Sequence, residues 1–194
     1  HAKKLETVTY REIVEMAHLG AKIVHPRAVE IAMEGHIPLR IRATGSKSLG
    51  TLIQESPNGP IAIIADRPVT GIAHVGNMVQ IRLEIADLEA GSKLALSIFQ
   101  RLAHEGISLD MIYVSPERIA FIIEQDWLGR AKSLLQDFSL AKVFVQEGVA
   151  KISAVGAGMR GVPGVMAKVA KALQGADITI LQTTDSHANI SCLV

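Results

Sequence analysis

Residues 79–125, VQIRLEIADLEAGSKLALSIFQRLAHEGISLDMIYVSPERIAFIIEQ, contain the pattern that decides the fold. Short alternating apolar runs in this stretch indicate strands, and a longer run with helical spacing indicates a helix. With the segment that follows, the expected elements are a strand, a helix, two strands, a helix and a strand, at residues 79–87, 92–106, 107–115, 118–125, 127–138 and 141–147. This βαββαβ order is the ferredoxin-like arrangement and predicts an α+β fold.

A second copy of this unit follows 71 positions later without a gap, so that Ile81 falls on Ile152 and Leu102 on Leu173. The second copy has an expected strand at 150–158, a helix at 163–176 and strands at 177–185 and 188–194, but it lacks the final helix and strand. We therefore expect two ferredoxin-like modules, at residues 79–148 and 149–194, of which the second is truncated. An extra strand at 68–76, PVTGIAHVG, has no counterpart in the repeat, so we expect residues 61–78 to complete the edge of the second module.

Residues 1–53 form a different unit, and residues 54–60 (QESPNGP) have the composition of a linker. Thr9 and Glu12 have the spacing of a capping box, which predicts a helix that Gly20 can close. Pro26 suits the first turn of a second helix. Two strands follow this helix, in the segment IPLRIRAT at residues 37–44 and at residues 51–53. Because these elements make a poor core alone, we expect the tail of a larger α/β domain and a piece of a longer protein.

The composition excludes several classes of function. The chain has 194 residues, 48% of them hydrophobic and 20% charged, as in globular proteins. Its formal charge of +1 disfavours a nucleic-acid partner, and no apolar run approaches the ~20 residues of a membrane span. The single Cys192 excludes an internal disulfide and fits a cytoplasmic setting, and the histidines lack metal-ligand spacing.

Two features of the modules suggest a ligand. Gly156, Gly158 and Gly161 form a G-x-G-x-x-G pattern, but a helix and an antiparallel-looking strand pair follow it, which disfavours a dinucleotide site. These glycines are either a structural turn or a place where a carboxylate can approach backbone N–H groups at a helix start. Asp110 interrupts the apolar run ISLDMIYV, so its carboxylate either faces water or awaits a cation, whereas the second module has Leu181 there.

The segment at 8–53, with GAKIVHPR as its most specific stretch, resembles the C-terminal part of the aspartate kinase catalytic domain. VTGIAHVGNMVQIRLEIAD at 69–87 and ISAVGAGMRGVPGVMAKVAKAL at 152–173 are similar to the two ACT modules that follow that domain. The resemblance implies an enzyme that phosphorylates the side-chain carboxylate of L-aspartate with ATP and Mg²⁺. It also implies that the catalytic residues lie mostly upstream, so that this chain alone is inactive and holds no cofactor.

The resemblance further implies that the modules bind an end-product amino acid and form a homodimer. The effector positions of the family fall on Leu88, Gly91, Lys93, Leu94 and Ala95 in a strand-to-helix loop, on Ser108, Leu109 and Asp110, and on a turn at Ser115 and Pro116. Asp110 matches the carboxylate that receives the side-chain ammonium of the effector. Gly158, Arg160 and Gly161 form a possible second effector loop.

This sequence departs from the family at two places. Pro116 stands where lysine-sensitive members tend to have glutamate, and Asp185, Ser186 and His187 stand where many relatives have Thr-Ser-Glu. Lysine, meso-diaminopimelate, threonine or no effector at all therefore remain open. The alternative functions are a dimerisation scaffold that binds nothing and, on the glycine pattern alone, an NAD-dependent oxidoreductase.

Overall fold

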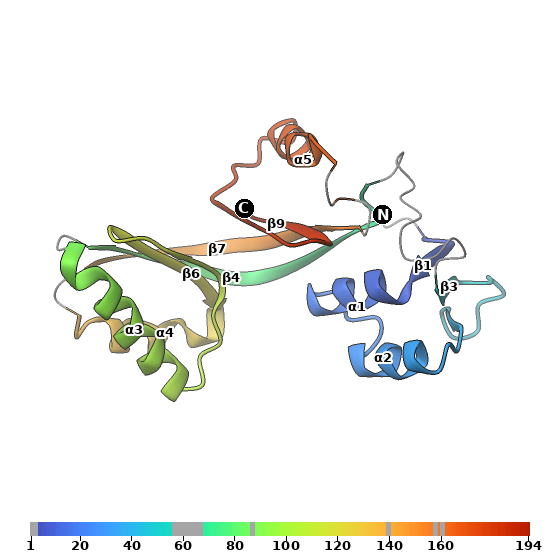
Figure 1. The fold of residues 1–194 in the computed structure, drawn as a ribbon, viewed down its shortest axis with the longest axis horizontal. Coiled ribbons are helices and arrows are strands. Elements are labelled where there is room, and N and C mark those ends of the chain that lie inside the picture. Colours follow the sequence, from blue (N-terminus) through green and yellow to red (C-terminus); the bar gives the residue numbers. More distant parts are fainter. Residues whose placement is uncertain (1–3, 56–67, 86–87, 139–140, 157–158, 160–161) are drawn as a thin grey trace. The chain divides into compact units, whose positions relative to one another are not determined.

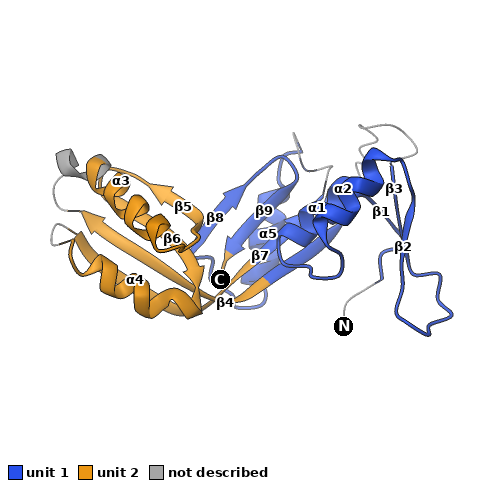
Figure 2. Cartoon of the chain, turned by 90° about the horizontal axis from the view of Figure 1, so that it is seen from below, with its two compact units in different colours: residues 1–74, 152–192 blue, residues 75–151, 193–194 orange. Residues whose placement is uncertain are grey.

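The structure is a computed structural model that describes residues 4–55, 68–85, 88–138, 141–156, 159 and 162–194. It contains two compact units, residues 1–74 with 152–192 and residues 75–151 with 193–194 (Figure 2). Helices are interspersed among the strands along the chain (Figure 1). The chain therefore has the mixed α+β architecture that the sequence predicts.

The N-terminal part of the first unit has a three-stranded sheet and two helices. The sheet has the order β1-β3-β2, formed by β1 (Thr7–Thr9), β2 (Leu39–Ile41) and β3 (Thr51–Gln54). β1 and β3 are parallel, and β1 is a strand that the sequence analysis missed because it is only three residues long. Helices α1 (Tyr10–His18) and α2 (Pro26–Glu34) lie in the same unit.

Local signals place both helices. The Thr9 hydroxyl accepts a hydrogen bond from the Glu12 backbone N–H at 3.3 Å, and the Glu12 carboxylate accepts one from the Thr9 backbone N–H at 3.0 Å. The predicted capping box is thus confirmed. Gly20 adopts φ of +109° just after α1, and Pro26 is the first residue of α2. The apolar faces of α1 and α2 pack with Ile53 in one buried cluster.

A six-stranded sheet follows, with the order β5-β6-β4-β7-β9-β8. Its strands are β4 (Gly71–Ile85), β5 (Asp110–Val114), β6 (Arg118–Glu124), β7 (Ala141–Val155), β8 (Gln182–Asp185) and β9 (Asn189–Leu193). The backbone hydrogen bonding between β4 and β7 extends to the residue before β4, because the Thr70 N–H donates to the Val155 carbonyl at 2.8 Å.

Two of these strands are longer than the sequence analysis expects. Residues 68–76 and 79–87 read as separate strands, but 71–85 form the single strand β4, and 141–155 form the single strand β7. Each contains one residue with positive φ, Asn77 at +59° and Gly148 at +71°, and the strand continues on both sides of it. The module boundaries predicted at 79 and 149 therefore fall inside continuous strands.

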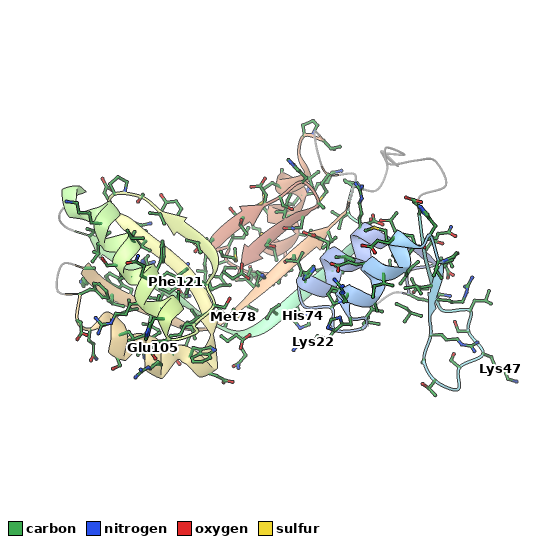
Figure 3. All side chains as sticks on the ribbon, turned by 60° about the horizontal axis from the view of Figure 1, so that its bottom comes forward. Lys22, Lys47, His74, Met78, Glu105 and Phe121 are labelled. Atoms are coloured by element: carbon green, nitrogen blue, oxygen red, sulfur yellow. The ribbon has the colours of Figure 1, made fainter. Side chains whose placement is uncertain are left out.

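The second unit has its own hydrophobic core. Helices α3 (Leu88–His104) and α4 (Leu128–Leu135) cover one face of β4 and β6, and η1 (Gln125–Trp127) precedes α4 (Figure 1). Phe121 at the centre of β6 is fully buried against these helices and meets Phe99 edge-on at a centroid distance of 6.4 Å (Figure 3). In the antiparallel register of β4 and β6, Phe121 lies opposite Ile81.

The C-terminal part contains α5 (Val165–Gln174), β8 and β9. The sequence predicts a strand over 177–185, but only 182–185 form one. Asp177 adopts φ of +55° and Ile178 stays 38% exposed, so the start of this segment leaves the extended conformation. The β-strand pattern of 188–194 is confirmed by β9.

Candidate effector site

The Asp110 carboxylate lies on the face of the sheet opposite to the helices. Asp110 begins β5 and pairs with Ile122 of β6, the neighbour of the helix-facing Phe121. Because successive residues of a strand point to opposite faces, Asp110 and Phe121 project to different sides. The pairing of β5 and β6 is interrupted between Asp110 and Tyr113, and Met111 has φ of +48°. Asp110 thus stands at a bulge near one end of the strand order.

Both oxygens of this carboxylate accept hydrogen bonds. Asp110 Oδ1 accepts from the Met111 backbone N–H at 2.7 Å, and Asp110 Oδ2 accepts from Lys151 Nζ. The Lys151 side chain is 8% exposed, whereas that of Asp110 is 45% exposed. Of the two expectations for Asp110, water or a cation, the structure supplies a cation, and the cation belongs to the chain itself.

Lys151 is the residue that the sequence analysis missed. It lies on β7, between the buried Val149 and Ser153, at a position where alternation predicts an apolar side chain. Its partner is 41 residues away in sequence, and local patterns contain no information on such a contact. The available signal was the lysine itself, since a buried ammonium needs a carboxylate partner.

The predicted strand-to-helix loop is part of a helix. Leu88, Gly91, Lys93, Leu94 and Ala95 all lie within α3, which begins at Leu88, so the expectation of a loop at these positions is wrong. Because helical N–H groups beyond the first turn bond to carbonyls four residues earlier, those of Leu94 and Ala95 are not available to a carboxylate. Lys93 is exposed, and Leu94 and Ala95 are buried in the core of the second unit.

The remaining first-module positions lie around β5. Ser108 is exposed, and Leu109 is half-buried against the core. The Ser115 hydroxyl donates to the Arg118 carbonyl at 3.2 Å and accepts from the Arg118 N–H at 3.1 Å, so it closes the turn between β5 and β6. Pro116 is exposed in the same turn. The structure therefore brings Ser115 and Asp110 to opposite ends of one short strand.

The glycine pattern is described at its first position only. Gly158, Arg160 and Gly161, the possible second effector loop, lie outside the described residues. At Gly156, a Cβ atom would lie 2.1 Å from the Pro68 carbonyl oxygen, so a side chain there is incompatible with the approach of the segment at 68–70. The Gly156 N–H donates to the Ala188 carbonyl at 2.9 Å. Close backbone packing accounts for this glycine.

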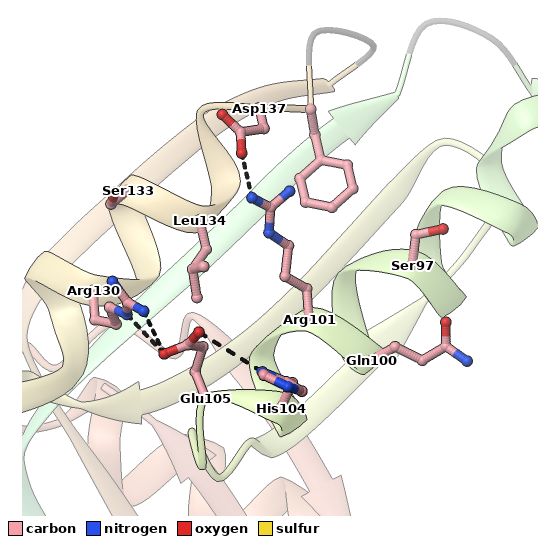
Figure 4. Close-up of a pocket in the computed structure, with 10 residues that line it drawn as sticks. Ser97, Gln100, Arg101, His104, Glu105, Arg130, Ser133, Leu134 and Asp137 are labelled. Atoms are coloured by element: carbon pink, nitrogen blue, oxygen red, sulfur yellow. Dashed lines mark hydrogen bonds and ion pairs between the residues drawn. The ribbon is translucent and has the colours of Figure 1, made fainter.

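A groove between α3 and α4 carries a second set of charged groups (Figure 4). Arg130 Nε and Nη2 donate to Glu105 Oε2 at 2.8 and 2.6 Å, and Arg101 donates to Asp137. The hydrogen bond from Arg130 is the main cause that lowers the pKa of Glu105 below its ordinary value. Each arginine is neutralised by a carboxylate, so this groove offers little attraction to an anion.

Other kinds of site find no support within the described part of the chain. No group of three or more His, Cys, Asp or Glu side chains is arranged there to hold a metal ion. No helix in that part is long and apolar enough to cross a membrane. Burial raises the pKa of the Cys192 thiol, which disfavours the thiolate that a nucleophile requires.

A comparison with protein families identifies the class of protein to which the fold belongs. A family model of the ACT domain matches residues 144–194, the region of β7, α5, β8 and β9. Together with the α+β fold, this match defines a chain built on tandem ACT modules of the ferredoxin-like type.

The particular family follows from its relatives. Aspartokinase 1 of Bacillus subtilis is 38% identical over 196 residues, covering 100% of this chain and 48% of the relative. The solved structure of aspartokinase alpha and beta subunits is 30% identical with a TM-score of 0.58, covering 64% of this chain and 86% of that chain. Aspartokinase III of E. coli, solved in complex with lysine and aspartate, is 25% identical with a TM-score of 0.74, covering 99% of this chain and 43% of that chain. The chain belongs to the aspartokinase family and contains its regulatory ACT region.

The chain spans about half the length of the curated relatives that it matches. The resemblance of residues 8–53 and of the two modules to this family, noted from the sequence, is confirmed.

Proposed function

We propose that this region binds an end-product amino acid and thereby regulates an aspartate kinase activity, the transfer of phosphate from ATP to the side-chain carboxylate of L-aspartate. The observation that carries the proposal is the Asp110 carboxylate, which already holds a side-chain ammonium in the structure. A carboxylate in this position can hold the ammonium of an amino-acid effector in place of its internal partner. The relative from E. coli was solved with lysine bound, which supports the same class of ligand here.

The effector candidates are lysine, meso-diaminopimelate and threonine. Isothermal titration calorimetry of the chain with each amino acid, at the same pH and salt, tests the proposal directly. We expect heat of binding with at least one of them. If none of the three binds at millimolar concentration, the effector function is refuted for this chain.

We also propose that the chain has no kinase activity by itself, because the family's phosphate-binding and catalytic residues lie mostly upstream of the matched half. ATP and Mg²⁺ then belong to the full-length enzyme. A hydroxylamine assay for aspartyl phosphate, with full-length enzyme as the positive control, should give no product with this chain. Measurable turnover would overturn this assignment.

The second candidate function is a dimerisation scaffold, and β5 favours it. This strand ends the strand order, and its residues Ile112, Tyr113 and Val114 are between 49% and 54% exposed. An edge strand with apolar side chains is a surface that a second copy can cover. Sedimentation at tens of micromolar should show a homodimer, and replacing Ile112 and Val114 with lysine should shift it to monomer. A dimer that binds no amino acid would favour the scaffold over the effector function.

A further inference from the structure

We propose that Lys151 is a built-in ligand of Asp110 that selects against effectors with a side-chain ammonium. The inference rests on the proposed effector function and specifies which amino acids the site accepts. A diamino acid must displace the Lys151 ammonium before its own ammonium can reach Asp110. An amino acid with an uncharged side chain does not compete with Lys151.

The burial of Lys151 is the first support for its role as a ligand of Asp110. An ammonium removed from water without a partner costs several kcal/mol, so a lysine with 8% exposure requires a counter-ion. Asp110 is the carboxylate that meets Lys151 among the described residues. The pair therefore belongs to the resting state of this unit and is not a chance surface contact.

The second support is that both oxygens of the Asp110 carboxylate already accept hydrogen bonds within the chain. One carboxylate oxygen accepts from the Met111 N–H and the other from Lys151 Nζ. The negative charge that would attract a second ammonium is thus compensated within the chain. At 45% exposure Asp110 remains reachable from solvent, so an incoming ligand can contact it but gains little by doing so.

The residues around the ion pair of Asp110 and Lys151 are mostly buried. Ile122, the register partner of Asp110, is fully buried, and Met111 is 4% exposed. Ile122 also pairs with Gln80 of β4, which is 6% exposed on the same face. The pair is thus buried on its Lys151 side and half-exposed on its Asp110 side, and an ion pair in such a position is screened less than a fully exposed one.

Tethering makes Lys151 a strong competitor. Because β7 holds Lys151 next to Asp110, the contact forms within the chain, at an effective concentration that is millimolar or higher for short connections. A free diamino acid at micromolar concentration cannot match this. The unmutated chain should therefore prefer threonine or another monoamino effector to lysine and diaminopimelate.

The test compares two ligands that differ only in the ammonium, L-lysine and L-norleucine. Calorimetry is run on the unmutated chain and on the variants K151M, D110N, K151M/D110N and K142M, with threonine as the monoamino reference. Methionine conserves the volume and apolar stem of lysine and removes the charge. Lys142 is an exposed lysine on the same strand and serves as the matched control.

We expect K151M to bind lysine at least about tenfold more tightly than the unmutated chain, the ratio that one charged hydrogen bond is worth. Norleucine and threonine affinities should stay unchanged, D110N should cancel the gain in the double variant, and K142M should have no effect. Far-UV circular dichroism verifies that each variant is folded, and K151Q replaces K151M if the latter is not.

Two results overturn the inference in different ways. In the first, threonine binds, but a folded K151M or K151Q binds lysine no more tightly than the unmutated chain, or the double variant K151M/D110N keeps the gain in lysine affinity. The selecting role of Lys151 is then wrong, and the effector function stands. If no variant binds any of these amino acids, both the effector function and the selection fail.

Discussion

Replacing Gly156 with alanine should destabilise the chain through a clash that the structure locates. The added Cβ would lie 2.1 Å from the Pro68 carbonyl oxygen and 3.1 Å from the Thr70 nitrogen, whereas ordinary contacts begin at 3.4 Å. The backbone at 68–70 must then move by about 1 Å, which a closely packed interior resists. The reason is steric and does not involve a ligand.

Two backbone hydrogen bonds near Gly156 determine how far Gly156→Ala should lower the free energy of unfolding. The Thr70 N–H donates to the Val155 carbonyl at 2.8 Å and the Gly156 N–H to the Ala188 carbonyl at 2.9 Å, and both lie at the clash. Each is worth about 0.5–1.5 kcal/mol, and overpacking alone costs about 1–3 kcal/mol. We therefore expect Gly156→Ala to lower the free energy of unfolding by about 2–4 kcal/mol.

Gly129→Ala is the matched control, because the same chemical change should have the opposite sign there. Gly129 lies in α4, and a Cβ at this position would meet nothing within 4 Å. Alanine is favoured over glycine by about 0.5–1 kcal/mol in a helix interior and by less at the second helical position, which Gly129 occupies, so this variant should be slightly more stable than the parent.

Urea unfolding followed by far-UV circular dichroism, without nucleotide or amino acid, measures both variants. If Gly156→Ala stays within about 0.5 kcal/mol of the parent, the packing explanation for this glycine is refuted. The glycine pattern would then need another explanation, and a thermal-shift titration with NAD would be the next experiment. We expect no NAD-dependent shift.

Three further outcomes are expected. Thr9→Ala should lower the free energy of unfolding by about 1 kcal/mol, because it removes the hydroxyl that accepts from the Glu12 N–H, whereas Thr9→Ser should be nearly neutral in the same urea titration. The hydrogen bond from Arg130 lowers the pKa of Glu105, so the stabilisation by the ionised Glu105 carboxylate is present above the ordinary glutamate pKa and is lost as pH falls through the lowered value. Arg130→Gln should therefore raise the pKa of Glu105 in a carboxyl NMR titration. The buried Cys192 thiol, whose pKa burial raises, should react slowly with a disulfide reagent in the native chain and fast in urea, and fast native labelling would contradict its burial.

The parts of the fold that local chemistry determines could be predicted from the sequence. The capping box at Thr9 and the proline that begins α2 act within a few residues, so a single sequence contains all the information. The strand–helix–strand order of the modules follows from the apolar period, which is also local. The length of β4 and β7 was missed because Asn77 and Gly148 interrupt the alternation, and a bulge and a turn look alike in sequence.

The candidate site shows where local patterns stop being informative. Asp110 stood out because a carboxylate within an apolar strand requires an explanation, and the structure gives it a hydrogen-bonded cation. Lys151 stood in an equally apolar strand, and the same rule applied to it would have identified a buried charge in need of a partner. Two opposite charges in apolar strands can form one ion pair that offsets the desolvation cost of both, although here they fall in different predicted modules. The amino-acid sequence alone therefore marks each of these two residues as a charge that needs a partner, whereas only the structure shows that the two charges meet.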